Sequence, residues 1–157
     1  MIGHQASLFS LVDDWQSSEF KANVLRLAEA SALLDIPVML TSGIEEVPNG
    51  PLVPQGVSSR IPSIFLAREK SILGIVVRTF KVTCRKQIVM ASIVIDVCIT
   101  FPALSAVQEG YEMLTVFDAS GKFNQGVRDF SLAQMVQAGV QSMNLFSTVC
   151  ELAGKTF

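Results

Sequence analysis

The feature that most constrains the fold is an apolar stretch of 20 residues, Ile88 to Val107, which contains a single charged residue, Asp96. A stretch of this length is long enough to cross a bilayer as a helix. The β-branched cluster at 93–95 and the proline at Pro102 instead divide it into a strand half and a helix half. The sequence therefore predicts a buried strand that leads into a buried helix, and no membrane contact.

The rest of the chain repeats this alternation of apolar runs and segments with helical spacing. Strands are predicted at 36–42, 64–67, 87–93, 113–119 and 140–146, and helices at 19–35, 71–83, 100–109, 127–138 and 147–154. Alternation of this kind is typical of βαβ units, which form parallel sheets covered by helices on both faces. We therefore expect one α/β domain over residues 1–157, a three-layer sandwich with a mostly parallel sheet. Such a sheet also explains why half of the residues are apolar and only 17% are charged.

Charge and cysteine content exclude several classes of function. The net charge is −2 and like charges do not cluster, so we expect neither a nucleic-acid surface nor a basic membrane-binding face. Three cysteines without CxxC spacing favour a reducing compartment, and the N-terminal sequence does not resemble a signal peptide, so we expect a cytoplasmic protein. A single histidine and no glycine-rich phosphate loop predict no metal and no cofactor.

Cys98 is the strongest candidate for chemistry. It follows a predicted buried strand and precedes a predicted helix, and in parallel sheets functional sites lie beyond the carboxyl ends of the strands. A helix N-terminus lowers the pKa of a nearby thiol and offers free N–H groups to an oxyanion. The alternative is a buried, inert thiol that serves packing.

Several motifs carry a resemblance to a known family. They are "GHQASLFSLV", "IPVMLTS", "PNGPLVP", "KQIVMASIVIDVCITFPALSA", "EGYEMLTVFDASGKFN" and "QMVQAGV…CELAG", and together they span nearly the whole chain. In these motifs the chain resembles the isochorismatase-like cysteine hydrolases, which include the nicotinamidases. The resemblance implies a six-stranded parallel sheet in the order 3-2-1-4-5-6 and an acyl-enzyme intermediate on a cysteine.

The resemblance also implies roles for individual residues. The nucleophile is Cys98, and the basic residue of the triad is Arg68, with Lys70 as a rival. The oxyanion is expected to bind the backbone N–H groups of Val97 and Cys98. The implied substrate is a small molecule with an amide, ester or ether-type bond, and the implied assembly is a homo-oligomer.

The N-terminal residues depart from the family pattern in two ways. Gly3 stands where the family has its catalytic aspartate, so the usual proton acceptor is lost, and His4 is the nearest substitute. Only Met1 and Ile2 precede it, so the first strand is expected to be truncated and the domain shortened at its N-terminus. Two functions therefore stay open: a hydrolase acting through Cys98, or a catalytically impaired family member that serves as a binding or interaction domain.

Overall fold

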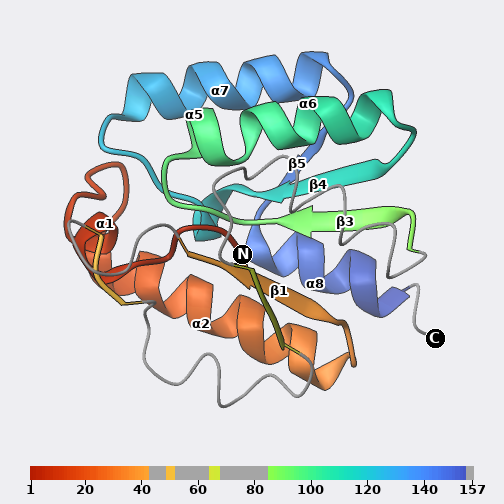
Figure 1. Ribbon diagram of the computed structural model, residues 1–157, viewed down its shortest axis with the longest axis horizontal. Helices are drawn as coiled ribbons and strands as arrows, with labels where there is room; N and C mark the ends of the chain where they lie inside the picture. Colours follow the sequence, from red (N-terminus) through yellow and green to blue (C-terminus); the bar gives the residue numbers. More distant parts are fainter. Residues whose placement is uncertain (43–48, 52–63, 68–84, 155–157) are drawn as a thin grey trace.

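Two pieces of parallel sheet lie between two layers of helices (Figure 1). The computed structural model describes residues 1–42, 49–51, 64–67 and 85–154. The strands are β1 (Val38–Thr41), β2 (Ile64–Ala67), β3 (Gln87–Met90), β4 (Glu112–Val116) and β5 (Gln141–Met143). On one face lie α2 (Ser17–Leu33) and α8 (Leu145–Gly154), and on the other α5 (Ile95–Cys98), α6 (Thr100–Gln108) and α7 (Gln125–Gln137). The predicted three-layer α/β fold is confirmed.

The N-terminal residues join the two pieces of sheet. β1 pairs with β2 in one piece, and β3, β4 and β5 form the other in that order, with every pairing parallel. Ile2 forms one parallel bridge to Thr41 and another to Ser92, so it lies between β1 and β3. Ile2 thus links the two pieces of sheet near the carboxyl ends of β1 and β3.

The apolar stretch from Ile88 to Val107 divides where its β-branched cluster and proline predict. Its first residues belong to β3, residues 91–94 form a bend, and α5 and α6 follow. Pro102 lies in the first turn of α6, where the missing N–H does not interrupt the helical hydrogen bonds. Among the described residues no helix has both the length and the apolar character needed to cross a membrane.

Glycines end two of the helices as the sequence predicts. Gly110 follows α6 with φ of 85°, and Gly139 follows α7 with φ of 96°. Both are left-handed conformations, which glycine adopts without a steric cost. α7 begins two residues earlier than predicted, because the side chain of Asn124 accepts a hydrogen bond from the N–H of Val127 and caps the helix. The predicted helix at 71–83 lies outside the described residues.

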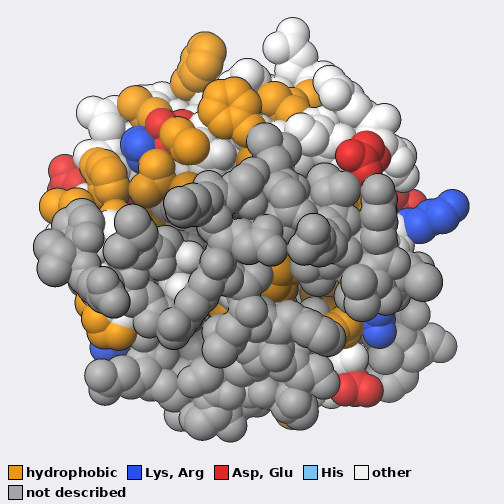
Figure 2. All heavy atoms as spheres, in the orientation of Figure 1, with side chains coloured by type: hydrophobic (Ala, Val, Ile, Leu, Met, Phe, Trp, Pro, Cys, Tyr) orange, Lys and Arg blue, Asp and Glu red, His pale blue; other side chains and the backbone are white. Residues whose placement is uncertain are grey.

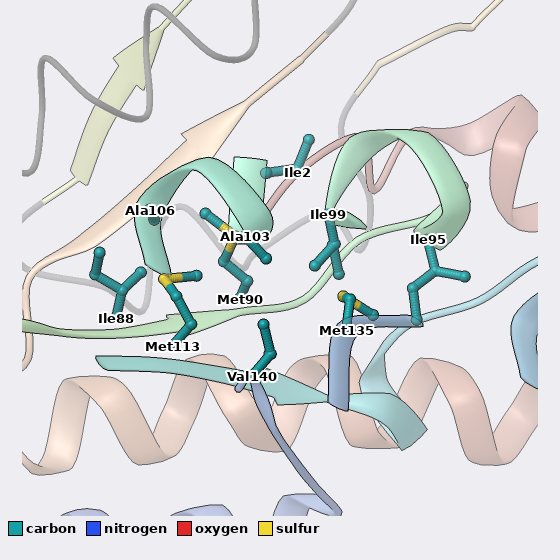
Figure 3. Packing of buried hydrophobic residues seen from close by; sticks show 10 residues of the cluster. All are labelled: Ile2, Ile88, Met90, Ile95, Ile99, Ala103, Ala106, Met113, Met135 and Val140. Carbon is teal, nitrogen blue, oxygen red and sulfur yellow. The ribbon is translucent and has the colours of Figure 1, made fainter. Parts of the chain in front are cut away.

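The sheet separates two apolar clusters. The cluster under α6 and α7 is shown in Figure 3 and contains Ile2, Ile88, Met90, Ile95, Ile99, Ala103, Ala106, Met113, Met135 and Val140. The cluster under α2 and α8 contains Phe20, Val24, Leu27, Ala91, Ile93, Val116, Ala119 and Leu145. A further short helix, α1 (Ala6–Ser10), and the 3₁₀ turn η1 (Phe117–Ala119) close the carboxyl end of the sheet beside the second cluster.

Candidate functional site

The segment that leads to Cys98 is bent sharply at Val94. This residue has φ of 67° and ψ of 56°, a left-handed conformation that is costly for a β-branched side chain. Hydrogen bonds hold it there: its N–H donates to the carbonyl of Gly121, whose own N–H donates to the carbonyl of Ser92, both at 2.9 Å. The carboxyl ends of β3 and β4 are thus tied together directly before Cys98.

Cys98 is the last residue of α5, a single helical turn, and not the first residue of a helix. α6 begins two residues later, at Thr100, as the sequence predicts, and activation of the thiol by its N-terminus stays a prediction. The N–H groups of Val97 and Cys98 both donate to the carbonyl of Val94, at 3.1 and 2.9 Å. An oxyanion at these two groups would require this turn to open, because their hydrogens are already bonded.

Polar groups surround the half-buried Cys98 thiol. Burial raises the pKa of the thiol, and the negative charge of Asp96 acts in the same direction. The Ser92 side chain, whose hydroxyl donates to the carbonyl of Ile93, and the positive charge of Lys122 both act against the increase in this pKa. Lys122 Nζ forms an ion pair with Asp96 Oδ1 at 2.7 Å. The described site is therefore a thiol beside a lysine–aspartate pair.

The lysine of this pair is fixed through its own backbone. The N–H of Lys122 donates to Asp14 Oδ1 at 2.9 Å, and Arg128 Nη1 donates to the Asp14 carbonyl oxygen at 3.0 Å. Burial raises the pKa of the Asp14 carboxyl, and the backbone N–H of Lys122 and the positive charge of Arg128 oppose the increase. Arg128 also lies over the ring of Trp15, 4.9 Å from its centroid. α7 and the segment after α1 therefore position Lys122.

Sequence reasoning missed Lys122, Asp96 and Ser92 as neighbours of the thiol. The signal for Lys122 was present, because "DASGKFN" is the turn after a parallel strand and such turns meet at one edge of the sheet. Ser92 had no such signal, because it lies inside an apolar run and its approach to Cys98 depends on the bend at Val94.

Gly3, the position of the lost aspartate, lies close to the segment that carries Cys98. Its N–H donates to the carbonyl of Thr41 at 3.0 Å, and a Cβ atom built on it would lie 3.7 Å from the carbonyl oxygen of Ile93. Its φ is +63°, so any side chain here would be held in a left-handed conformation. The space for a side chain exists, at a conformational cost.

His4 is buried among aromatic rings on the α2 face. Its ring lies 5.9 Å from that of Phe9 and 6.3 Å from that of Phe20, and its Nε2 donates to the carbonyl oxygen of Ala119 at 3.1 Å. Burial lowers the pKa of His4 to about 3. Cys98 packs instead against the cluster under α6 and α7. The structure therefore places His4 in a core role and does not bring it together with the thiol.

The remaining residues that the sequence analysis named cannot be placed relative to Cys98. Arg68 and Lys70 lie outside the described residues. In the described ranges, no three histidine, cysteine or carboxylate side chains lie close enough together to hold a metal ion. A cavity of about 600 Å³ lies elsewhere, along β1 and β3 toward their amino ends, and none of Asp96, Cys98 and Lys122 lines it.

Comparison with known proteins identifies the family. No protein-family model matches the chain. It is 40% identical over 156 residues to the Escherichia coli protein named "Probable hydrolase YcaC", covering 97% of this chain and 75% of that protein. The chain belongs to the isochorismatase-like hydrolase family. The crystal structure of the E. coli YcaC product, described as an octameric hydrolase of unknown specificity, superposes with a TM-score of 0.91 at 39% identity, covering 98% of this chain and 77% of that one.

Two further structures extend this isochorismatase-like assignment. YcaC from Pseudomonas aeruginosa, solved with hexane-2,5-diol and covalent acrylamide, has a TM-score of 0.87 at 45% identity, and the match covers 98% of this chain and 78% of that chain. An isochorismatase family protein from Burkholderia thailandensis has a TM-score of 0.75 at 16% identity, and the match covers 97% of this chain and 93% of that chain. The second likeness concerns the fold alone.

Proposed function

We propose that this isochorismatase-like protein hydrolyses a small-molecule amide, ester or ether-type bond through a covalent intermediate on Cys98. The observation that carries the proposal is the position of the thiol, half-buried at the carboxyl end of β3 beside Lys122 and the Ser92 hydroxyl. Both groups favour the thiolate, which is the nucleophilic form of cysteine.

For an amide or ester the chemistry has two balanced steps. Cys98 Sγ bonds to the acyl carbon, the bond to the leaving amine or alcohol breaks, and the leaving group takes the thiol proton. Water then cleaves the thioester, releases the acid and returns a proton to Sγ. Arg68 is proposed to stabilise the negative charge that develops on the acyl oxygen. Because Gly3 offers no base, we expect the first step to be slow. A positioned general base typically raises the reaction rate by about 10²- to 10⁴-fold.

The covalent acrylamide of P. aeruginosa YcaC supports the proposal. Acrylamide is an electrophile that reacts with thiolates, so its covalent attachment in a relative 45% identical to this chain is consistent with a reactive nucleophile in this family.

The test is trapping followed by turnover. The protein is incubated with acrylamide and separately with a p-nitrophenyl ester, and adducts are located by peptide mass spectrometry. We expect an acyl adduct on Cys98 and loss of ester hydrolysis in Cys98→Ser. Cys150→Ser is the matched control, because Cys150 is an exposed free cysteine on α8. Hydrolysis that survives Cys98→Ser contradicts the mechanism, and an unreactive Cys98 in the folded protein favours a binding domain instead.

We also propose that the protein assembles as a homo-oligomer, as the octameric E. coli YcaC does. Large apolar side chains are exposed on α5, α6 and α7 and just before α7, namely Val97, Phe101, Phe123, Val127 and Phe130. Figure 2 shows apolar side chains gathered over this end of the molecule. Exposed apolar surface of this kind marks interaction sites. Sedimentation analysis is expected to show an oligomer, and a monomer at micromolar concentration would contradict this part of the proposal.

A further inference from the structure

The backbone of Ser92 is fixed by the sheet, and its hydroxyl is the group that can still change partner. Its N–H donates to Ser120 Oγ at 3.3 Å, and its carbonyl accepts a bond from the N–H of Gly121 at 2.9 Å. The residue is fully buried, so water does not compete for these groups. The hydroxyl can therefore turn about its own bonds while the residue stays in place.

Two acceptors compete for the single hydrogen of this hydroxyl. In the structure it donates to the carbonyl oxygen of Ile93. The same side chain acts on the Cys98 thiol as a hydrogen-bond partner, in the direction that favours the thiolate. A serine hydroxyl has one hydrogen and two acceptor lone pairs. It can thus accept a bond from the thiol while it donates to Ile93, but it can donate to a thiolate only after it releases Ile93.

The carbonyl of Ile93 also faces the position of the lost aspartate. A Cβ atom built on Gly3 would lie 3.7 Å from this oxygen. Glycine extends no polar side chain toward the thiol, whereas the buried hydroxyl of Ser92 lies on the same segment as this carbonyl. A neutral hydroxyl does not retain the thiol proton, so what it can supply is a hydrogen bond to the negatively charged sulfur.

We propose that the Ser92 hydroxyl is a two-position switch that stabilises the Cys98 thiolate during the reaction. In the resting protein it accepts a bond from the S–H group and donates to Ile93. The thiol proton passes to the leaving group, and while the sulfur is negatively charged the hydroxyl turns and donates to it. Once Sγ has bonded to the acyl carbon, the hydroxyl returns to Ile93. Ser92 neither gains nor loses a proton, and the inference rests on the proposed nucleophilic role of Cys98.

The test is the pH dependence of Cys98 alkylation by iodoacetamide, measured by peptide mass spectrometry in the parent, in Ser92→Ala and in Ser120→Ala. Ser120 is the matched control, because its hydroxyl is equally buried and donates to the Val116 carbonyl at 2.6 Å, and it is not among the groups that act on the thiol. Ser92→Ala is expected to move the midpoint to higher pH and to make alkylation at pH 7 about tenfold slower, because a hydrogen bond to a charged group is lost. Ser120→Ala is expected to keep the parent midpoint.

The alkylation rate at high pH separates the switch from a role in packing. Once the thiol is fully ionised, Ser92→Ala should react at least as fast as the parent, because a thiolate of higher pKa is the stronger nucleophile. A role in packing alone would change the rate at every pH and leave the midpoint in place. That result, or an equal shift of the midpoint in Ser120→Ala, would overturn the proposal.

Infrared spectra of the parent protein need no variant at position 92. The S–H band of Cys98, obtained as the difference between the parent and Cys98→Ser, is expected at a lower frequency than that of a thiol in an apolar solvent, because the resting S–H donates to Ser92. A band at the frequency of a free thiol would overturn the proposal even if Ser92→Ala does not fold.

Ester hydrolysis distinguishes failure of this inference from failure of the proposed function. Hydrolysis that survives Cys98→Ser contradicts the hydrolase mechanism, and a shifted alkylation midpoint in Ser92→Ala would still support the contact between hydroxyl and thiol. Hydrolysis that is lost in Cys98→Ser, together with an unchanged midpoint in Ser92→Ala, overturns the switch alone.

Discussion

At the carboxyl ends of β3 and β4, hydrogen bonds from Val94 to Gly121 and from Gly121 to Ser92 tie the strands together, and side chains fill the space around them. At the amino ends of β1 and β3, the same sheet encloses a cavity of about 600 Å³. The two ends differ because Ile2 bridges β1 and β3 only near their carboxyl ends, among the residues that the structure describes. The candidate site can thus be well ordered in a sheet that is incomplete elsewhere.

The largest effect is expected from matched truncations at the two ends. Val116→Ala, at the carboxyl end of β4 and fully buried, should lower the free energy of unfolding by about 2–3 kcal/mol, because it leaves a new cavity. Val38→Ala, at the start of β1, should cost only about 1 kcal/mol, because its side chain already borders a cavity. Urea denaturation measures both. Equal losses would show that the cavity beside Val38 is closed in solution.

The second effect is a loss of stability in acid caused by the buried His4. Its pKa is about 3 in the folded protein and about 6.5 in the unfolded chain. As the pH falls below 6.5, the unfolded chain binds a proton that the folded protein does not, so stability should fall by about 2 kcal/mol at pH 5. The terminal amine of Met1, whose pKa burial lowers to about 5, acts in the same direction.

Comparison with the variant His4→Gln isolates the contribution of the histidine to this pH dependence, because the Met1 amine is unchanged in that variant. The difference in urea midpoint between pH 7 and pH 5 should be smaller in His4→Gln than in the parent. An identical difference in the two proteins would mean that His4 is accessible to protons in the folded state.

The third effect is a gain of function at Gly3. Gly3→Asp restores a carboxylate beside the segment that carries Cys98 and is expected to raise ester hydrolysis at least tenfold. The left-handed φ of +63° should cost about 1 kcal/mol of stability. Gly3→Ala is the control, since it has the conformational cost without the carboxylate. If both variants have the parent rate, the family aspartate has no function to restore in this chain.

The smallest effects are expected at the ion pair beside the thiol, and their signs are opposite. Asp96→Asn removes a charge that raises the pKa of Cys98, so alkylation by acrylamide at pH 7 should be about threefold faster. Lys122→Gln removes a charge that lowers this pKa, so alkylation should be about threefold slower. Changes of the same sign in the two variants would show that packing, and not charge, controls the thiol.

The sequence predicted the elements better than the site. β2 has the predicted limits, and α6 and α7 end at the predicted glycines, because local patterns of apolar residues and turn residues determine these features. The position of Cys98 at the end of a one-turn helix was not predictable, because it follows from the left-handed bend at Val94, which tertiary hydrogen bonds stabilise against its own preference.

The two bridges of Ile2 have a consequence for how this molecule unfolds. Here the bonds of residues 1–3 hold β1 against β3 at one end only, among the residues that the structure describes. Release of these residues would remove the described hydrogen bonds between the two pieces of sheet while the pairing inside each piece stays in place. The cooperativity of unfolding thus depends on the first three residues of the chain.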